Sequence, residues 1–495
     1  MESREPAMTL NVESSNRDEK AGGTAGFGAR LALILIALLW ASQLNGLIGL
    51  ISGNVQSEIA INFHTTQIVW FSQISLLVGT FTSPFVFKYA TMYGKKRVLV
   101  VITVLGLIGD TIAAVATNYE TLLVGRAIAG FYAPSIALVY AMARDVFPRH
   151  LVGQASGFLG GGMGVLALGG PFLSGWIIDD FGYRGALWFM VIATAISLLG
   201  LLVLVPESPV REPRTRMDWA GGVLVGGGLT AVIYGVGEGA DWGWGDGRTL
   251  GCIIGGLAAV VAFVVVEGKV AHPMFPISLL GRRRVWATFL VTGLIMGAVF
   301  AQGTVLNLLV LMPDIPGLSD GLGWTATKNA WVGAPTSVTM IVVSVLAGSL
   351  ARRFDSRLLL AIGGALVAIG IALTSQFHYS VGQLMSVGIV SGLGMGLVVA
   401  LVPIMIIESV SPEEQALGNG AQSKIQGVFQ GVFTQIAFVL VARNSKEMQG
   451  TAFYNDDSFS NGFLFFAGAV ALATLLVPLI PRAKRLDQVE AGHAV

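Results

Sequence analysis

The amino-acid sequence predicts an all-α membrane protein with fourteen transmembrane helices and both termini in the cytoplasm. Most of its fourteen apolar segments approach or exceed the roughly 20 residues that a helix needs to cross the hydrocarbon of a bilayer. Lysines and arginines gather on alternate connections between these segments. With 54% hydrophobic and only 12% charged residues, the chain has too little polar surface for a soluble protein of 495 residues.

The predicted spans lie on the long apolar runs of the sequence. They are residues 31–52, 67–90, 97–117, 121–143, 152–178, 185–205, 219–237, 249–267, 286–311, 329–350, 357–376, 381–407, 420–442 and 459–480.

Basic residues divide unequally between the two sides that these spans define. The tails and the even-numbered connections hold 24 of the 30 lysines and arginines, the odd-numbered connections hold five, and Arg126 lies inside a span. Cytoplasmic loops of membrane proteins retain positive charge. The alternation therefore predicts cytoplasmic termini and an even number of helices.

Spans one to six and spans nine to fourteen form two similar halves around a shorter insert. The predicted units are a polar N-terminal tail at 1–30, a six-helix bundle at 31–205, a linker with two further transmembrane helices at 206–285, a second six-helix bundle at 286–480 and a cytoplasmic tail at 481–495. Paired bundles of this kind indicate a transporter that rocks one half against the other around a site near the bilayer midplane.

The sequence lacks the residues and motifs that several other functions require. The net charge of +1 argues against nucleic-acid binding, and the single Cys252 excludes both an intramolecular disulfide and a cysteine-based metal site. The five histidines are scattered singly, and no glycine-rich phosphate-binding loop is present. We therefore predict no cofactor, no metal and no enzymatic activity. The first 30 residues have no apolar core, so we also expect no removable signal peptide.

The connection after the second helix of each half carries a repeated basic motif. Phe87–Leu99 lines up with Gly348–Leu360 at the same junction of the second half. Cations at such a junction can hold helix carboxyl ends and anionic lipid headgroups. The alternative is topology alone, because any cytoplasmic loop of a membrane protein is basic. We name these connections the gate loops, with candidate residues Gly94, Lys95, Lys96, Arg97, Arg352, Arg353, Asp355 and Arg357.

This motif resembles the short signature between helices two and three of the major facilitator superfamily. Thr91 and Arg352 stand where the family usually has an acid, so the family's charge latch does not carry over unaltered. Leu122–Gly130 is similar to the family's fourth-helix signature, whose buried arginine, here Arg126, is associated with proton coupling.

The fifth predicted helix resembles the glycine and proline signature of the family's antiporters, through Gly164, Gly170, Pro171 and Gly175. Simple tight packing of helices is the alternative explanation for its glycines. Together with the fourteen spans, this stretch makes the chain similar to the fourteen-helix drug:proton antiporters. The resemblance covers residues 31–480 and implies export of drugs or other amphiphilic compounds.

Asp110 and Arg126 are the charges that we place deep inside the spans. The two helices that carry them form a hairpin with its turn at Asn118–Glu120, so an antiparallel pair brings both side chains to one level. Burying a charge in hydrocarbon costs about 2.5–3.5 kcal/mol on insertion scales, so the two are expected to pair. We predict Asp110 as the proton carrier and Arg126 as its counter-ion. A static pair that joins the two helices is the alternative.

One departure from the antiporters bears on this prediction. Their first helix usually carries an acid, whereas the corresponding stretch here, Asn45–Ser52, has none. Either Asp110 has taken over the coupling or the chain uses another energetic scheme. Four further acids at span boundaries are interpreted as solvated residues, namely Glu58, Glu238, Asp314 and Glu408.

Uncharged polar and aromatic side chains are the candidates for substrate contact. On the thirteenth span, Gln422, Gln426 and Gln430 recur every four residues and form one polar stripe. Such a stripe favours a wet cavity, although hydrogen bonding between helices is equally compatible with any single member. The predicted cavity residues are Gln43, Asn45, Gln73, Tyr132, Tyr140, Gln302, Asn307, Gln426, Phe429 and Gln430.

The sequence thus favours a proton-driven exporter of small amphiphilic molecules that works as a monomer in the cytoplasmic membrane, in contact with its lipid. An uptake porter for a specific solute is the second hypothesis, because Pro206–Pro209 resembles a fragment of the sugar-porter signature. A transporter-like receptor or a channel is a third, and the absence of a repeated filter-like loop disfavours the channel.

Overall fold

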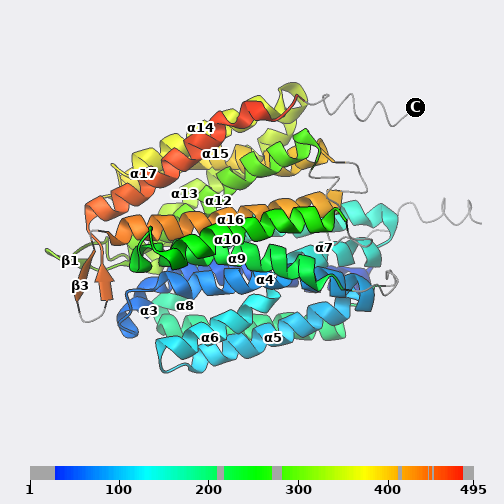
Figure 1. Ribbon diagram of the computed structural model, residues 1–495, viewed down its shortest axis with the longest axis horizontal. Coiled ribbons are helices and arrows are strands. Elements are labelled where there is room, and N and C mark those ends of the chain that lie inside the picture. The colour runs from blue at the N-terminus through cyan, green and yellow to red at the C-terminus, as the bar shows by residue number, and fades with distance from the viewer. Residues whose placement is uncertain are drawn as a thin grey trace, which may run out of the picture.

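The computed structural model describes residues 28–208, 217–269, 281–410, 415–443, 445–448 and 451–482. Long helices run side by side through the whole length of the molecule (Figure 1). Most of the predicted N-terminal tail, part of the linker and nearly all of the C-terminal tail lie outside the described residues.

The helices of the first half follow the predicted spans closely. They are α2 (Ala29–Asn54), α3 (Gln56–Asn62), α4 (Val69–Tyr93), α5 (Lys95–Val115), α6 (Tyr119–Ala129), the short 3-10 helix η1 (Gly130–Tyr132), α7 (Ser135–Val146) and α8 (Arg149–Val203). The linker contributes α9 (Trp219–Trp242) and α10 (Gly247–Glu267).

The predicted second half also consists mainly of long helices. It contains α12 (Arg283–Leu311), α13 (Ala326–Arg353), α14 (Ser356–Thr374), α15 (Val381–Ile407), α16 (Gln415–Ala442), α17 (Asp456–Leu475) and the short η2 (Val477–Leu479).

Thirteen helices in the described part of the chain are long and apolar enough to cross a membrane. Helix α8 has 55 residues, and at 1.5 Å per residue it is far longer than one crossing requires. Gly182 interrupts it with a φ of 64° and a ψ of −170°. Because glycine alone adopts this conformation without strain, the chain bends there. Helix α8 therefore contains both the fifth and the sixth predicted spans.

The fourth predicted span, 121–143, is a helix in two pieces instead of a continuous one. Helix α6 ends at Ala129, η1 follows, and α7 begins only at Ser135. Pro134 directly precedes α7 and has no backbone N–H to continue the hydrogen-bond ladder. The break lies against α4, where a Cβ on Gly130 would be 2.6 Å from the carbonyl oxygen of Ser75.

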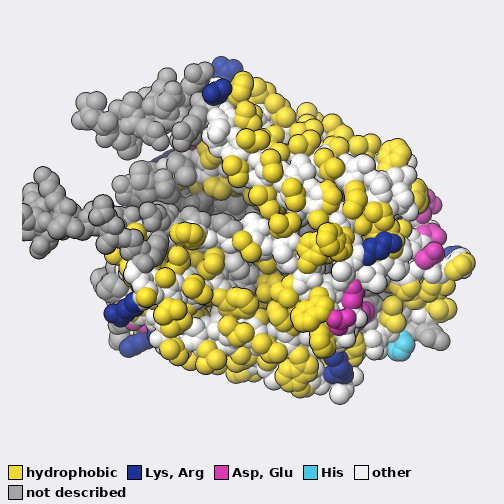
Figure 2. All heavy atoms as spheres, turned by 180° about the vertical axis from the view of Figure 1, so that it is seen from behind, with side chains coloured by type: hydrophobic (Ala, Val, Ile, Leu, Met, Phe, Trp, Pro, Cys, Tyr) yellow, Lys and Arg dark blue, Asp and Glu magenta, His cyan; other side chains and the backbone are white. Residues whose placement is uncertain are grey.

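Two short antiparallel hairpins were not predicted. Strand β1 (Asp314–Ile315) pairs with β2 (Ser319–Asp320), and β3 (Lys446–Met448) pairs with β4 (Thr451–Phe453). Both lie at one end of the helices (Figure 1), which we call the hairpin end. The gate loops lie at the opposite end, which we call the basic end. Charged side chains gather at the two ends, and apolar side chains cover much of the surface between them (Figure 2).

The two linker helices pack across the boundary between the halves. Helix α9 contacts α4 in the first half and α16 in the second, and α10 lies against α9. A Cβ on Gly226 would lie 2.6 Å from the carbonyl oxygen of Phe81 on α4, so glycine permits this close approach. On the other side, Ile233 of α9 packs on Gly431 of α16.

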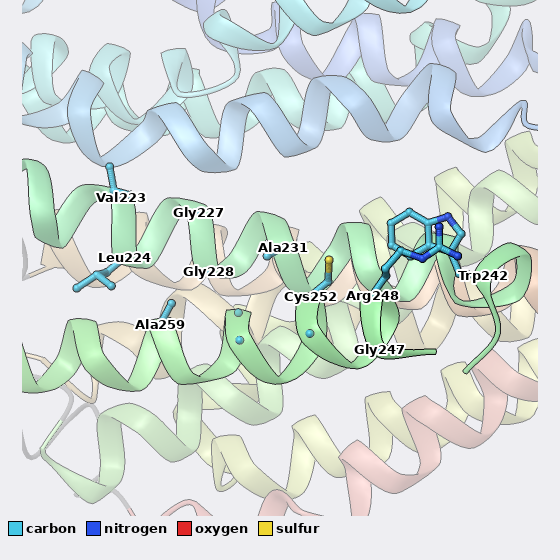
Figure 3. A pocket seen from close by; sticks show the side chains of 13 residues that line it. Val223, Leu224, Gly227, Gly228, Ala231, Trp242, Gly247, Arg248, Cys252 and Ala259 are labelled. Carbon is cyan, nitrogen blue, oxygen red and sulfur yellow. The ribbon is translucent and has the colours of Figure 1, made fainter. Parts of the chain in front are cut away.

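An open, apolar groove of about 620 Å³ also lies between α9 and α10 (Figure 3). Its walls are mainly glycine, alanine and other small or aliphatic residues. At one end the guanidinium of Arg248 lies 5.0 Å from the ring centroid of Trp242. Arg248 is already paired with Asp246, at 3.1 Å. The groove therefore has no converging set of free polar groups among the described residues.

Helices α5 and α6 approach each other through glycine. A Cβ on Gly109 would lie 2.3 Å from the backbone nitrogen of Ala129, and one on Gly125 would lie 2.5 Å from that of Ala113. Backbone atoms cannot move aside as a flexible side chain can. This close contact sets the distance between the helices that carry Asp110 and Arg126.

Gly109→Ala is expected to destabilise the protein by about 1–3 kcal/mol, because the methyl group forces α5 and α6 apart. Gly255→Ala is the matched control, since nothing lies within 4 Å of a Cβ at Gly255 on α10. The control should be neutral or stabilising by up to about 1 kcal/mol. Thermal unfolding of both variants in detergent provides the comparison, and equal melting temperatures would contradict the close-packing argument.

Candidate functional site

Asp110 on α5 and Arg126 on α6 face each other inside the first half. Nη1 of Arg126 lies 3.4 Å from Oδ1 of Asp110. The side chains are 4% and 0% exposed for Arg126 and Asp110, respectively, so both charges are removed from solvent. The hairpin predicts that both side chains lie at the same depth. The contact between them confirms this prediction.

Further polar groups from other helices complete the surroundings of this pair. Thr194 of α8 donates its hydroxyl hydrogen to Oδ2 of Asp110 at 2.8 Å. Nη2 of Arg126 donates to the Ser52 hydroxyl of α2 at 3.0 Å, and its guanidinium carbon lies 5.2 Å from the ring centroid of Phe71 on α4. Side chains from α2, α4, α5, α6 and α8 thus meet at one buried ion pair.

The ion pair does not satisfy every hydrogen-bonding group of its two side chains. The 3.4 Å separation is longer than the roughly 2.7–2.9 Å of a strong charge-assisted hydrogen bond. Nε of Arg126 is buried and has no hydrogen-bond partner among the described residues. An ion pair that is buried but loosely bonded can separate when its helices move, which a tightly bonded structural pair resists.

The two halves are joined at the hairpin end by the carboxylate of Asp179. Its oxygens accept hydrogen bonds from the backbone N–H groups of Ala326 at 2.8 Å and Thr327 at 2.9 Å, at the start of α13. These N–H groups have no partner within their own helix, and the helix dipole favours a negative charge there. Asp179 thus caps a helix of the opposite half.

The antiporter-like residues of α8 have different surroundings. Gly175, one turn before Asp179, lies at the contact with α13, where a Cβ would be 2.7 Å from the backbone of Thr327. Gly170 contacts side chains of Leu50 and Leu166, and nothing lies within 4 Å of a Cβ at Gly164. Pro171 lies inside α8. Among the three glycines, Gly175 has the clearest packing reason to lack a side chain.

Other described hydrogen bonds between the halves also lie toward the hairpin end. Thr451 of β4 donates to the carbonyl oxygen of Ala60 on α3 at 3.2 Å. Nε2 of Gln73, one turn into α4, donates to the carbonyl oxygen of Gly431 on α16 at 2.9 Å. Toward the basic end, α14, α15 and α17 diverge from α4, α5 and α6 (Figure 1).

The first gate loop is anchored within its own half. Lys95 forms an ion pair with Asp145, at the end of α7. The carboxylate of Glu207 accepts hydrogen bonds from the backbone nitrogens of Lys96 at 2.9 Å and Arg97 at 3.3 Å. Gly94 has a φ of 110°, and a Cβ there would lie 2.9 Å from the carboxyl carbon of Glu207. Acids from α7 and from the segment after α8 thus replace the one that Thr91 does not supply.

The second gate loop is anchored in the same manner. Glu408, just after α15, accepts hydrogen bonds from Ser356 at 2.9 Å and from Arg284 of α12 at 3.2 Å. Asp355 accepts one from the backbone nitrogen of Arg357 at 2.9 Å and caps α14. Arg353 is exposed, and the side chain of Arg352 lies outside the described part. Interpreting Glu408 as a solvated residue was wrong, because its side chain is only 6% exposed and paired.

The predicted cavity residues divide into two groups. Tyr132 is buried against Gly106 of α5, and Gln43 donates to the carbonyl oxygen of Leu159 on α8 at 3.0 Å, so both make contacts within the first half. Gln422 is buried and donates to Thr292 of α12 at 3.3 Å. The others are at least partly accessible, apart from the buried Gln73, and they are Asn45, Tyr140, Gln302, Asn307, Gln426, Phe429 and Gln430.

Aromatic packing organises part of the stripe on α16. Phe429 stacks on Phe433 with ring centroids 6.0 Å apart. Phe429 also packs on Gly293 and Gly297 of α12, whose missing side chains make room for the ring. Asn307 accepts a hydrogen bond from Asn329 of α13 at 3.1 Å.

Lys424 is a cation that lies inside α16, within the predicted span 420–442. Its ammonium nitrogen is 5.5 Å from the ring centroid of Phe87 on α4, in the opposite half. No carboxylate in the described residues forms an ion pair with it. Phe87 belongs to the first gate loop motif, so a cation–π contact joins the halves near the basic end.

The fold and the buried pair define a helical, multi-pass membrane protein. The Major Facilitator Superfamily model matches residues 23–423 and 304–493. The chain therefore belongs to the Major Facilitator Superfamily.

Curated relatives include proteins named as transporters. The chain is 28% identical over 350 residues to an uncharacterized MFS-type transporter of Mycobacterium tuberculosis, which covers 70% of this chain and 50% of that protein. This chain thus spans about half the length of that relative. It is 23% identical over 430 residues to the multidrug transporter protein MdtP of Bacillus subtilis, covering 85% and 77% of the two chains. It is 29% identical over 377 residues to a uridine/deoxyuridine transporter of Lactococcus lactis, covering 72% and 74%.

Solved structures show the same fold. A peptide transporter determined in complex with sulfate superposes with a TM-score of 0.66, at 12% sequence identity, over 94% of this chain and 97% of its own length. At this identity the likeness concerns the fold alone.

Asp179→Ala is expected to loosen the closure at the hairpin end, because two backbone N–H groups lose a charged acceptor worth roughly 1.5–3 kcal/mol each. Asn307→Cys, introduced in a Cys252→Ala background, reports the opening through its rate of reaction with a maleimide in detergent. The rate should rise about tenfold. Asp180→Ala is the control, since Asp180 is the exposed neighbouring acid. An unchanged rate of maleimide reaction in Asp179→Ala would show that Asp179 does not contribute to the closure at the hairpin end.

Glu58 on α3 predicts a pH dependence of stability. Burial raises the pKa of Glu58 above 4.5, a hydrogen bond from the Tyr183 backbone opposes this, and nearby Asp179 adds to it. A carboxyl whose pKa is higher in the folded state stabilises the fold below its unfolded pKa, and that stabilisation is lost as the pH rises through the folded pKa.

Glu58→Gln is therefore expected to melt at a higher temperature than the unmodified protein at neutral pH. The difference should shrink as the pH falls toward 4.5, where the native carboxyl is protonated as well. Asp314→Asn at an exposed position is the control and should show no such trend. A difference that stays constant with pH would contradict the assignment to Glu58.

Proposed function

We propose that this protein is a proton-coupled exporter of small amphiphilic molecules that works by alternating access in the cytoplasmic membrane. The observation that carries this proposal is the buried and loosely bonded pair of Asp110 and Arg126. Charges inside a membrane-spanning bundle are costly and are most often retained for function. In this proposal Asp110 carries the proton and Arg126 neutralises the carboxylate when the proton leaves.

The surroundings of the pair support a role in coupling. Asp110 is 0% exposed at its side chain, so a proton reaches it only after the helices around it move. The five helices α2, α4, α5, α6 and α8 contribute to its surroundings. When Asp110 is protonated, Arg126 loses its partner ion and is left with its contacts to Ser52 and the ring of Phe71.

Alternating access is supported by the uneven distribution of contacts between the halves. The capping of α13 by Asp179 and the contact of Thr451 with Ala60 lie at the hairpin end. The gate loops at the basic end are anchored within their own halves, by Asp145 and Glu207 in one and by Glu408 in the other. We propose that the molecule is closed at the hairpin end and opens at the basic end, which faces the cytoplasm together with both termini.

The proposed substrate site lies between the halves and uses the partly accessible residues of α12 and α16. Phe429 and Phe433 offer apolar area, while Gln426, Gln430 and Gln302 offer a few polar groups that orient a ligand. We further propose that residues 31–205 and 286–480 form the two moving bundles, with α9 and α10 as a brace between them, and that the protein works as a monomer.

Export is favoured over import by the similarity to the multidrug transporter protein MdtP. Uptake of a specific solute is the second candidate function. It is favoured by the similarity to a uridine/deoxyuridine transporter, which matches the chain at a comparable length. The two candidates share the fold and the buried pair and differ in the direction of flux.

Inverted membrane vesicles test the proposal directly, because their orientation turns export into accumulation. A proton gradient should drive accumulation of a fluorescent amphiphile by the native protein, and Asp110→Asn should abolish it while binding of the amphiphile persists. Asp241→Asn, a change on α9 outside the pair, is the control and should transport normally.

Normal accumulation by Asp110→Asn would mean that the pair is structural and that coupling lies elsewhere. If the native protein moved no amphiphile but a gradient drove a nucleoside in right-side-out vesicles, uptake would replace export as the function.

A further inference from the structure

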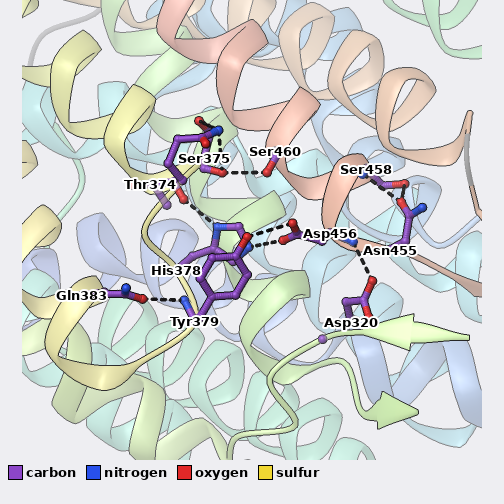
Figure 4. A network of polar contacts seen from close by, with 12 residues as sticks. Asp320, Thr374, Ser375, His378, Tyr379, Gln383, Asn455, Asp456, Ser458 and Ser460 are labelled. Carbon is purple, nitrogen blue, oxygen red and sulfur yellow. Dashed lines mark hydrogen bonds and ion pairs between the residues drawn. The ribbon is translucent and has the colours of Figure 1, made fainter. Parts of the chain in front are cut away.

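His378 is a buried histidine in the connection between α14 and α15, at the hairpin end of the second half (Figure 4). Its side chain is 1% exposed. Nδ1 lies 2.8 Å from the backbone carbonyl oxygen of Thr374, and Nε2 lies 2.6 Å from Oδ1 of Asp456 at the start of α17. Both ring nitrogens therefore face oxygen atoms at hydrogen-bond distance.

The chemistry of these two oxygens fixes the number of protons. A carbonyl oxygen only accepts, so Nδ1 must carry a hydrogen and donate it to Thr374. A neutral imidazole has a single N–H, which leaves a lone pair on Nε2. Opposite an ionised Asp456 carboxylate, two lone pairs would meet at 2.6 Å and repel. The contact is favourable only with one further proton, on Nε2 or on the carboxyl group.

The groups around this contact are acidic or neutral. Tyr379 donates its hydroxyl hydrogen to Oδ2 of Asp456 at 2.9 Å, and this hydrogen bond raises the pKa of Tyr379, so the hydroxyl remains a donor. Asp320 of β2 accepts from the backbone nitrogen of Asp456 at 2.9 Å, and the exposed Asp457 follows in α17. Helix α14 contributes only neutral groups. No described lysine or arginine forms an ion pair with Asp456.

Asp456 is also part of the segment that reaches the first half. The carbonyl oxygen of Tyr454 accepts a hydrogen bond from the backbone nitrogen of Asp320 at 3.0 Å. Three residues earlier in the chain, Thr451 donates to Ala60 of α3. A contact that holds the start of α17 therefore also holds the segment that closes the hairpin end.

We propose that His378 and Asp456 together bind one proton, and that this proton fastens the α14–α15 connection to α17 as a pH-dependent latch at the hairpin end. The site is in the opposite half from Asp110, and it needs no assumption about the direction of transport. Loss of the proton leaves a neutral imidazole facing a carboxylate, so the latch loosens as the pH rises.

Asp456→Asn gives a sharp test, because an amide can donate its own hydrogen to the lone pair of Nε2 and still accept from Tyr379. This variant should keep the latch without an added proton. Hydrogen exchange of the backbone amides at 376–380 and 454–458 is compared in detergent at about pH 5.5 and about pH 8.5, on either side of the range in which histidine titrates. The intrinsic rate of amide exchange depends on pH. Each variant is therefore compared with the native protein at the same pH, where this rate is the same for both.

The native protein and Asp456→Asn should be equally protected at the lower pH. At the higher pH the native protein should exchange about fivefold faster, which is the factor that one hydrogen bond of about 1 kcal/mol makes. His378→Leu should exchange fast at both values, and His64→Gln, at an exposed histidine of the same end, should behave as the native protein. Parallel loss of protection in the native protein and Asp456→Asn would overturn the proposal.

A second measurement needs no variant at Asp456. The ¹⁵N chemical shifts of the His378 ring, assigned by their absence in His378→Leu, report the protonation of each nitrogen. The proposal expects Nδ1 to carry a hydrogen throughout and the pair to release one proton between the two pH values. A ring whose shifts do not change across this range would overturn it. Neither experiment measures transport. The latch proposal and the export proposal are therefore tested independently, and either one can fail while the other stands.

Discussion

The high cost of an unpaired charge in an apolar interior governs this structure. Asp110 and Arg126 are both nearly inaccessible, so each depends on the other and on the few polar groups that reach them. Two of these groups, Thr194 of α8 and Ser52 of α2, belong to helices that are distant from the pair in the sequence. The close approach of α5 and α6 at Gly109 and the packing of α8 on α5 bring these groups together.

The same physical rule explains the two ends of the molecule. At the hairpin end, backbone N–H groups at the start of α13 find a carboxylate in the opposite half, and the two halves are thereby joined. At the basic end, each gate loop finds its acid within its own half. The carboxylate that holds each of these groups therefore lies in the opposite half at the hairpin end and in the same half at the basic end.

The two proton-dependent features that we propose lie in different halves and arise for different reasons. The pair at Asp110 is buried among membrane-spanning helices and is bonded loosely, which suits a group that changes partners. The pair of His378 and Asp456 lies in a connection, with a histidine whose two nitrogens both face acceptors. The first suits coupling between helices, and the second suits a contact that responds to the pH of one compartment.

Much of the helical fold could be predicted from the sequence, because the length and hydropathy of a span are local properties. The contact between Asp110 and Arg126 was also predictable, since both lie on one hairpin at equal distance from its turn. The break at Pro134 and the bend at Gly182 lie inside apolar runs, where hydropathy gives no signal. The hairpins at the loops were missed because they are too short to show a strand pattern.

The sequence by itself determined the membrane-spanning character, the repeat of the gate loops and the pairing of Asp110 with Arg126 on neighbouring helices. Only the tertiary structure decided that Glu408 is buried, that Asp179 caps a helix of the opposite half and that Lys424 lies over Phe87. These partners are far apart in the chain, and no periodicity relates them. Their positions follow from how whole helices pack, which local sequence patterns do not encode.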